Sequence, residues 1–332
     1  MGDHTSVKFS NLAAIIQEFN VDGQNIVQGF TKKEHYEKYN RPWFGATIGR
    51  VANRLKGGVI TSLNGREVQL EQNDGANALH GGSRGYGRQE FEGPTVVKRN
   101  GREALLYTYL SPDGDQGYPG TVELKVYYVV SEVVEDGQPR SILDIEYEAE
   151  LVGDEVEETA VNITNHSYFN LSGGPSAAEG TIAKLATRDY LPLDGGIPVG
   201  HVEPHAIDTT QPFEFGPSAP FDDCFIVARD QTDVTIDTRS RPLKLLAGFF
   251  HTGTRINLQV SSTEPAFQFY AGHMIDVPEV DAENPARGAF SGFCIEPSRY
   301  VNAVNEPEWR HTVILKKGEK YGSKIQYMAW RS

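Results

Sequence analysis

Cysteine is scarce in this sequence, which has only Cys224 and Cys294 among its 332 residues. One bridge is the most that these two could form, so a disulfide-stapled fold is excluded. A reducing, cytoplasmic setting is therefore expected. Three formal N-glycosylation sequons begin at Asn162, Asn165 and Asn170, and we interpret them as chance matches.

Long apolar runs and clusters of positive charge are also missing. No segment approaches the roughly 20 apolar residues that a membrane helix needs, and the start of the chain has neither a basic flank nor a cleavage site. The net charge is −14, whereas a protein that binds a polyanion carries a basic patch or stripe. We expect no membrane and no nucleic acid as a partner.

Helical periodicity is rare, and alternation with a period of two takes its place. Apolar residues alternate with polar ones over 122–130, 143–150 and 256–260. In the second run the intervening residues are acidic, which predicts one buried face and one solvated, acidic face. A short helix is predicted over Thr31 to Tyr39, with Thr31 as its N-cap.

Turn signals separate these runs. Asn64-Gly65 predicts a tight hairpin, and Asp194-Gly195-Gly196 predicts another turn. Many short strands with frequent turns favour an all-β fold, a large antiparallel β-sandwich with very little helix. Without a visible linker or repeat, residues 1–332 are expected to form a single domain.

The motifs of several enzyme classes are absent. The sequence has no phosphate-binding P-loop, no Cys-x-x-Cys or His-Glu-x-x-His zinc motif, and no Gly-x-Ser-x-Gly elbow. Its nine histidines are scattered without metal-ligand spacing. We expect no metal and no cofactor, which leaves chemistry that polar side chains can perform alone.

Four polar residues lie in apolar, strand-like surroundings. His166 follows a strand and precedes two aromatic residues, where burial could bring its pKa near neutrality; the alternative is a core histidine. Glu296 ends an apolar run and is either functional or a surface residue at the end of a strand. Gln268 lies within an aromatic strand and could instead face outward from a sheet edge. Asp222 and its neighbour point to opposite faces of a strand, so at most one faces a site.

Two further segments offer hydrogen-bond donors. Asn53 and Arg54 carry amide and guanidinium groups that suit sugar hydroxyls. His80 is followed by two glycines, which allow the backbone to turn sharply or to approach a ligand closely.

Taken together and in order, these segments resemble the aldose 1-epimerase (galactose mutarotase) family along essentially the whole chain. The string Asn-His-Ser-Tyr-Phe-Asn-Leu is the most specific of the matches. The matching segments are Gly49 to Arg54, Leu79 to Gly82, Gly117 to Gly120, Asn165 to Leu171, Tyr190 to Asp194, Phe221 to Phe225, Gln268 to Tyr270 and Gly292 to Glu296.

The resemblance implies a galactose mutarotase-like supersandwich that interconverts the α and β anomers of a free aldohexose. His166 would be the general acid at the ring oxygen, and Glu296 the general base at the anomeric hydroxyl. In a bell-shaped pH profile, Glu296 would then set the acid limb and His166 the alkaline limb. The implied sugar-binding residues are Asn53, Arg54, His80, Asp222 and Gln268. A small-molecule sugar is the expected partner, and the expected assembly is a monomer or a weak dimer.

Two departures from the family pattern lie beside implied site residues. Asp223 stands where the family usually has histidine. The residues that follow Glu296 also differ from the common form, and they are Pro297, Ser298, Val301 and Asn302. These changes leave the chemistry plausible and the preferred sugar open.

Two alternative functions stay open. The first is an epimerase that acts on a hexose 6-phosphate, which would need an arginine cluster for the dianion. The second is a carbohydrate-binding or sensing protein that keeps the pocket without catalysis.

Overall fold

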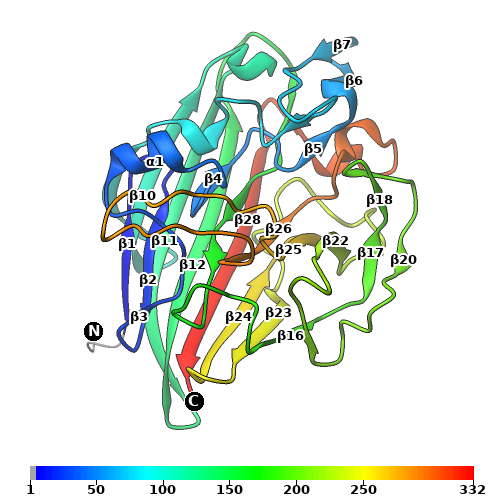
Figure 1. Cartoon of the computed structure of the whole chain (residues 1–332). Helices are drawn as coiled ribbons and strands as arrows, with labels where there is room; N and C mark the ends of the chain where they lie inside the picture. The colour runs from blue at the N-terminus through cyan, green and yellow to red at the C-terminus, as the bar shows by residue number, and fades with distance from the viewer. Residues whose placement is uncertain (1–4) are drawn as a thin grey trace.

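The computed structural model describes residues 5–332, in which strands are the predominant regular structure and helices are few and short (Figure 1). The largest element is a nine-stranded sheet with the order β21-β16-β23-β24-β28-β12-β11-β10-β9. Its strands are β9 (Glu92–Arg99), β10 (Arg102–Ser111), β11 (Val122–Glu135), β12 (Gln138–Leu151), β16 (Thr181–Leu185), β21 (Phe213–Glu214), β23 (Lys244–His251), β24 (Ile256–Ser262) and β28 (Lys320–Arg331). In Figure 1, β28 runs through the middle of this sheet between β12 and β24.

A six-stranded sheet with the order β15-β26-β25-β22-β17-β20 is the second large element. Its strands are β15 (Tyr168–Phe169), β17 (Asp189–Leu191), β20 (Glu203–Pro204), β22 (Asp222–Ile226), β25 (Ala266–Tyr270) and β26 (Phe293–Ser298). A three-stranded sheet contains β1 (Thr5–Phe9), β2 (Ile16–Val21) and β3 (Gln24–Asn25).

Short strand pairs and single turns of helix complete the fold. The pairs are β4 (Ala46–Ile48) with β14 (Thr164–His166), β5 (Arg54–Leu55) with β8 (Ala78–Leu79), β6 (Val59–Leu63) with β7 (Arg66–Gln69), β13 (Glu158–Ala160) with β27 (Ile314–Lys316), and β18 (Leu193–Asp194) with β19 (Ile197–Pro198). The helices are α1 (Lys33–Tyr39) and the 3-10 turns Lys56–Gly58, Tyr86–Arg88, Asp115–Gly117, Ala303–Asn305 and Arg310–Thr312.

The two large sheets pack face to face through aromatic side chains. Phe293 of β26 lies 4.4 Å from Phe249 of β23, and Phe169 of β15 lies 5.0 Å from Tyr327 of β28, measured between ring centroids. Both pairs belong to one buried hydrophobic cluster. The predicted antiparallel β-sandwich with very little helix is confirmed.

The alternating runs and turn signals correspond to real elements. The three runs lie in β11, β12 and β24. Asn64 and Gly65 both have positive φ and join β6 to β7, as a tight hairpin turn requires. Gly195 and Gly196 have positive φ between β18 and β19.

Two details of the prediction are wrong. The outward face of β12 is acidic but largely buried, because Arg99 and Arg239 lie against Glu146 and Glu148. Helix α1 begins later than expected, and Lys32 is its N-cap without a side-chain cap. The hydroxyl of Thr31 instead accepts a hydrogen bond from Asn284. No helix within residues 5–332 is long and apolar enough to cross a membrane.

Candidate active site

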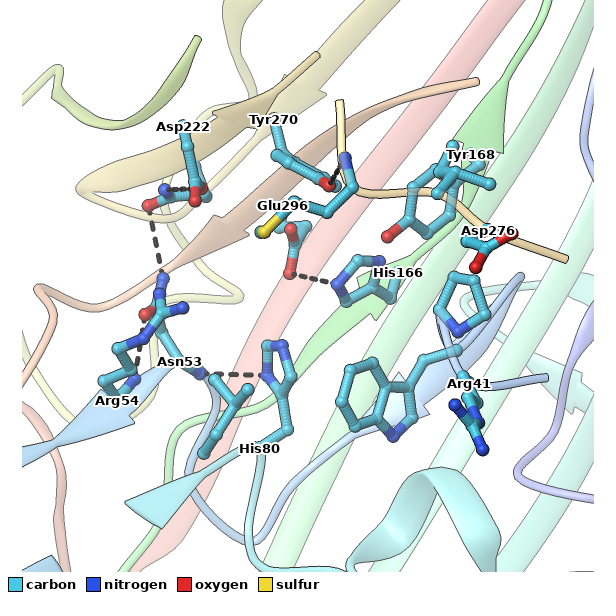
Figure 2. Close-up of a pocket in the computed structure, with 16 residues that line it drawn as sticks. Arg41, Asn53, Arg54, His80, His166, Tyr168, Asp222, Tyr270, Asp276 and Glu296 are labelled. Atoms are coloured by element: carbon cyan, nitrogen blue, oxygen red, sulfur yellow. Dashed lines mark hydrogen bonds and ion pairs between the residues drawn. The ribbon is translucent and has the colours of Figure 1, made fainter. Parts of the chain in front are cut away.

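All seven predicted site residues line one pocket of about 280 Å³ (Figure 2). The six-stranded sheet and β14 provide its floor, and the pair β5 and β8 together with loops provides its rim. The lining residues are Arg41, Pro42, Trp43, Asn53, Arg54, Leu79, His80, His166, Tyr168, Asp222, Gln268, Tyr270, Met274, Ile275, Asp276 and Glu296.

Strand register explains why distant residues meet on this floor. Gln268 of β25 is directly opposite Glu296 of β26, and Asp222 of β22 is opposite Tyr270 of β25. Side chains two residues apart share a face of a strand, so Gln268 and Tyr270 both face the pocket. Phe269 between them packs into the hydrophobic core.

This arrangement decides between the alternatives that the sequence left open. Gln268 lies on a central strand, with β22 on one side and β26 on the other, so it is not an outward residue of an edge strand. Glu296 is only 5% exposed, so it is not a surface residue at a strand end. His166 is buried but has a face in the pocket.

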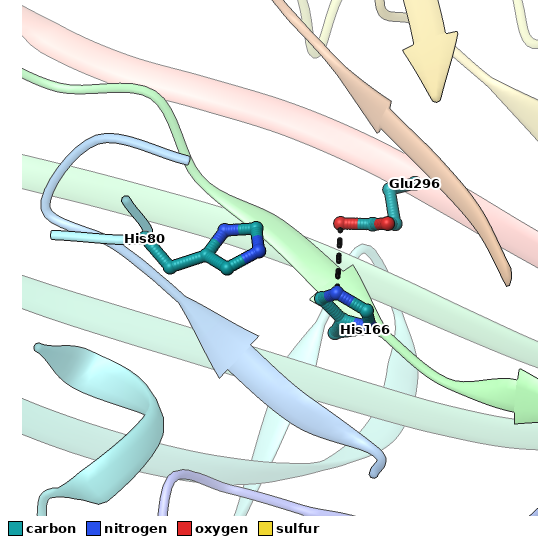
Figure 3. Close-up of side chains that lie close together, drawn as sticks. All are labelled: His80, His166 and Glu296. Atoms are coloured by element: carbon teal, nitrogen blue, oxygen red, sulfur yellow. Dashed lines mark ion pairs between the residues drawn. The ribbon is translucent and has the colours of Figure 1, made fainter. Parts of the chain in front are cut away.

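His166 and Glu296 both line the pocket and are in direct contact with each other (Figure 3). Nε2 of His166 lies 3.4 Å from Oε2 of Glu296. The imidazole ring of His166 stacks on the ring of Tyr168 and lies edge-on to the ring of His80. The distances between ring centroids are 5.0 Å and 5.2 Å. A potential acid and a potential base are thus close enough together to reach neighbouring atoms of one bound ligand.

Burial shifts the pKa of each group toward its neutral form. Burial lowers the pKa of His166 to about 3, so the expectation of a pKa near neutrality is wrong. Burial, with the nearby charge of Asp222, raises the pKa of Glu296 well above its usual range, and Arg54 opposes this shift. A charged form of either group loses its hydration in this pocket, which explains both directions.

His80 is held as a neutral hydrogen-bond donor. The backbone N–H of Asn53 donates to Nδ1 of His80 over 3.2 Å, so in the neutral ring the hydrogen is on Nε2. Burial, followed by the neighbouring His166 and Arg54, lowers the pKa of His80 well below its usual range. The ring therefore offers an N–H group to the pocket.

A chain of hydrogen-bonded polar side chains leads away from His80 along one side of the pocket. Asn53 donates from Nδ2 to Oε1 of Gln268 over 3.2 Å, and Gln268 donates from Nε2 to Oδ1 of Asp222 over 2.8 Å. Arg54 donates from Nε to Asp74 over 2.7 Å. Because these bonds occupy particular atoms of the side chains, they determine which of the remaining oxygen and nitrogen atoms can bind a ligand.

Three residues of the pocket have a strained backbone. Trp43, Asn53 and His80 all have positive φ, between 52° and 61°. For residues other than glycine this conformation costs of order 1 kcal/mol or more and persists only where the surroundings impose it. The strained backbone aims the three side chains at the same space.

Three potential metal ligands also meet here, although their sequence spacing gave no sign of it. Ligand atoms of His80, His166 and Glu296 lie within 4.8 Å of one another. The set does not fit a resident metal, because Nδ1 of His80 accepts the Asn53 N–H and its Nε2 must then carry hydrogen. A metal bound to Nε2 would require the ring hydrogen to move to Nδ1. Nδ1 would then face the backbone N–H of Asn53, and two donors cannot form a hydrogen bond with each other.

The departures from the family pattern fall outside the pocket wall. Asp223 points to the other face of β22, and its Oδ2 lies 3.9 Å from Nε2 of His205. This confirms that only one of the two adjacent acids faces the site. The other four residues do not line the pocket either, and they are Pro297, Ser298, Val301 and Asn302.

Sequence reasoning missed several residues that line the pocket. Tyr270 follows Gln268 by two positions, so strand alternation could have found it. Trp43 and Arg41, and also Met274 and Asp276, come from loops without periodicity. Their positions depend on loop conformation, for which the sequence carries no comparable signal.

The model of the aldose 1-epimerase family matches residues 1–328, and the chain belongs to this family. Galactose mutarotase of Sus scrofa is 36% identical over 310 residues, which cover 90% of this chain and 81% of that protein. The bifunctional protein gal10 of Schizosaccharomyces pombe is 35% identical over 325 residues, which cover 97% of this chain. The chain spans less than half, 43%, of the length of that bifunctional relative.

Solved structures show the same fold. The GalM/aldose epimerase homologue from C. elegans superposes with a TM-score of 0.81 at 22% identity, covering 100% of this chain and 97% of that one. Galactose 1-epimerase from Lactobacillus acidophilus gives a TM-score of 0.77 at 24% identity, covering 98% and 91%.

Proposed function

We propose that this protein is an aldose 1-epimerase that interconverts the anomers of a free aldohexose such as glucose or galactose. The contact between His166 and Glu296 inside the pocket carries this proposal. The names of the mutarotase relatives support it, because those proteins match 90% of the chain.

The reaction needs two proton transfers at neighbouring atoms. Glu296 takes the proton from the anomeric hydroxyl, and His166 gives a proton to the ring oxygen as the bond from C1 to that oxygen breaks. The open-chain aldehyde turns about the C1–C2 bond and closes on its other face, with the two roles reversed. Each positioned acid or base contributes roughly 10²–10⁴ in rate.

Other pocket residues bind the sugar and support this chemistry. Asp222, Gln268 and Asn53 present a connected row of donors and acceptors to the hydroxyl groups. His80 donates from Nε2, and Arg54 adds positive charge near the reacting atoms. Because Gln268 and Asp222 are already bonded to each other, the row is held in place before the sugar binds.

The shared proton of the pair determines the pH dependence. The reactive form has a carboxylate on Glu296 and an imidazolium on His166, while burial favours the neutral forms of both groups. Both arrangements contain the same number of protons, so a change of pH cannot convert one into the other. The bound sugar and the positive charge of Arg54 stabilise the reactive arrangement.

Polarimetry with freshly dissolved sugars tests the proposal. Catalytic amounts of protein should speed the mutarotation of α-D-glucose or α-D-galactose well beyond the buffer rate. Glucose 6-phosphate should be a poorer substrate, because Arg54 is already bonded to Asp74 and cannot serve freely as part of a dianion site. Binding of free sugars without any turnover would refute the enzymatic function, and turnover of the phosphosugar alone would refute the substrate class.

The proposal extends to setting and assembly. Both cysteines are free thiols, and the three sequon asparagines are buried, which supports a cytoplasmic protein. We propose one domain over residues 1–332, since a single hydrophobic cluster draws residues from Ala14 to Ala329. The large exposed apolar side chains are scattered over several elements, which favours a monomer or a weak dimer. The net charge of −14 favours a sugar over a nucleic acid as the partner.

A further inference from the structure

The two nitrogens of the His166 ring face different partners. Nε2 faces Glu296 and the pocket, whereas Nδ1 points into the protein and lies 3.4 Å from the sulfur of Cys294. Within residues 5–332, this sulfur is the one side chain that hydrogen-bonds to Nδ1. Cys294 is completely buried and forms no disulfide.

We propose that Cys294 is a positioning residue for His166, whose sulfur holds Nδ1 and thereby directs Nε2 at the ring oxygen of the sugar. This inference rests on the epimerase function proposed above and deepens it. Cys294 touches no substrate, because it lies behind the imidazole and does not line the pocket.

One strand holds both sides of the ring. Cys294 and Glu296 are two residues apart on β26, so their side chains project from the same face of the strand. The imidazole lies between them, with Nδ1 at the sulfur and Nε2 at the carboxylate. The spacing between base and positioning group is therefore built into the backbone of β26.

A thiol is an unusual partner at this position. Histidines in reactive sites commonly have Nδ1 bonded to a carboxylate or a backbone carbonyl, which stabilises the imidazolium. Burial raises the pKa of the Cys294 thiol well above its usual range, so the sulfur stays uncharged. A neutral sulfur is a weak hydrogen-bonding group, so it orients the ring without stabilising its positive charge.

The consequence is a strongly acidic imidazolium. A ring oxygen is a weak base and accepts a proton more readily from an acid that holds it loosely. The groups around the His166 ring are those expected around a strongly acidic imidazolium. Tyr168 stacks on one side, the neutral ring of His80 meets its edge, and among residues 5–332 Glu296 is the one carboxylate in direct contact. A backbone hydrogen bond of residue 166 raises the pKa of His166, but burial outweighs it.

The experiment compares three variants by mutarotation kinetics over a range of pH. Cys294→Ala removes the sulfur, Cys294→Ser replaces it by a hydroxyl that can hold Nδ1, and Cys224→Ala is the matched control. Cys224 is also a buried free thiol in the six-stranded sheet, but its side chain does not contact His166. Thermal unfolding of all three gives the structural cost of each change.

Cys294→Ala should lower kcat roughly tenfold with KM changed less than about twofold, because an oriented ring matters for the reaction more than for binding. Cys294→Ser should recover most of the lost kcat, since oxygen accepts from an imidazolium N–H better than sulfur does. It should also move the acid limb of kcat/KM to higher pH, because the lowered pKa of His166 places the protonation of this residue on the acid side of the profile. Cys224→Ala should keep the wild-type kcat and pH profile. The ¹⁵N resonance of His166 Nδ1 should shift in both Cys294 variants and not in Cys224→Ala.

Equal kcat, pH profile and Nδ1 resonance in Cys294→Ala and Cys224→Ala would overturn the inference. If Cys294→Ala fails to fold, Cys294→Ser decides, because an unchanged acid limb and Nδ1 resonance would also overturn it. A wild-type protein without activity on any free sugar would instead refute the proposed function. In that case the Nδ1 resonance still shows whether Cys294 holds the ring.

Discussion

Hydrogen bonds to ring nitrogens assign different tasks to the two pocket histidines. His80 receives a backbone N–H at Nδ1, which leaves Nε2 as a fixed donor. His166 meets a sulfur at Nδ1 and a carboxylate at Nε2, and within residues 5–332 no backbone N–H occupies Nε2. Under the proposed function, His80 would therefore serve binding and His166 would serve proton transfer.

The donor role of His80 predicts that a chelator leaves the enzyme active. EDTA followed by gel filtration should not change kcat for mutarotation, because Nε2 of His80 carries a hydrogen in place of a metal. Wild-type protein passed through the same column without EDTA is the control. Loss of activity that zinc or magnesium restores would contradict the assignment.

The directions of the two pKa shifts predict the pH profile of kcat/KM. In the active state, His166 and Glu296 together carry one proton. At low pH His166, whose pKa is lowered to about 3, takes up a second proton, so His166 sets the acid limb. At high pH Glu296, whose pKa is raised, loses the proton of the pair, so Glu296 sets the alkaline limb. This exchanges the limbs that the sequence suggested.

Kinetics from pH 4 to pH 9 can test this order. We expect the acid limb at least about one pH unit below the ordinary histidine value of about 6.5. The residual activity of Glu296→Gln depends on the imidazolium of His166 alone, so it should have no acid limb and should fall as the pH rises above the lowered pKa of His166. A fall centred at or above the ordinary histidine value of about 6.5 in that variant would restore the original order.

At the scale of single elements, β12 shows how a strand can carry acids on a covered face. Arg99 and Arg239 lie across Glu146 and Glu148 and shield them from solvent. Burial alone would raise the pKa of Glu148, but hydrogen bonds from Arg239 and Arg99 outweigh it and lower the pKa to about 2. The outward face of β12 is thus covered by a layer of ion pairs between these two arginines and two glutamates.

This layer predicts a pH-dependent contribution to stability. Because the folded-state pKa of Glu148 is depressed, its contribution is present above the unfolded value of about 4.3 and is lost as the pH falls toward 2. Glu148→Gln should lower the free energy of unfolding at pH 7 by about 1–2 kcal/mol, a range that allows for partial solvent screening. It should also flatten the acid dependence of urea unfolding.

Glu150→Gln is the matched control for this change. Glu150 is two residues further along the same face of β12, and it is more exposed and bonded to Lys320. We expect a change within about 0.5 kcal/mol at pH 7. Equal losses in the two variants would show that the cover provided by Arg99 and Arg239 adds nothing.

At the scale of the whole molecule, strand periodicity made the fold class predictable and left the packing of the site open. Alternation located β11, β12 and β24, whereas an aromatic segment placed Gln268 on a strand and an apolar run placed Glu296 on one. It carried no information about which strands are neighbours, so the contact between residues 166 and 296 rested on the family resemblance alone. Sheet order is set by non-local pairing, and a local pattern cannot show it.

Loops and ring environments were the least predictable parts. The positive φ of Trp43 and the rim position of Asp276 depend on how separate loops pack. The sequence led us to expect a pKa near neutrality for His166. Its pKa is lower because several distant elements together bury the ring, and their packing cannot be predicted from the local sequence. Asp223 seemed relevant to sugar preference until the structure placed its carboxylate beside His205.

The most direct measurement is the mutarotation rate of Glu296→Gln and His166→Asn beside the wild-type protein, on the sugar that the wild type turns over fastest. Gln keeps the size of Glu but cannot accept the proton, and Asn cannot donate an acidic one. Each change should lower kcat by at least about 10² while far-UV circular dichroism and thermal unfolding stay close to wild type. If either folded variant kept near wild-type turnover, the acid–base pair would not be the catalytic centre, and for Glu296→Gln the neighbouring Asp222 would become the first alternative base.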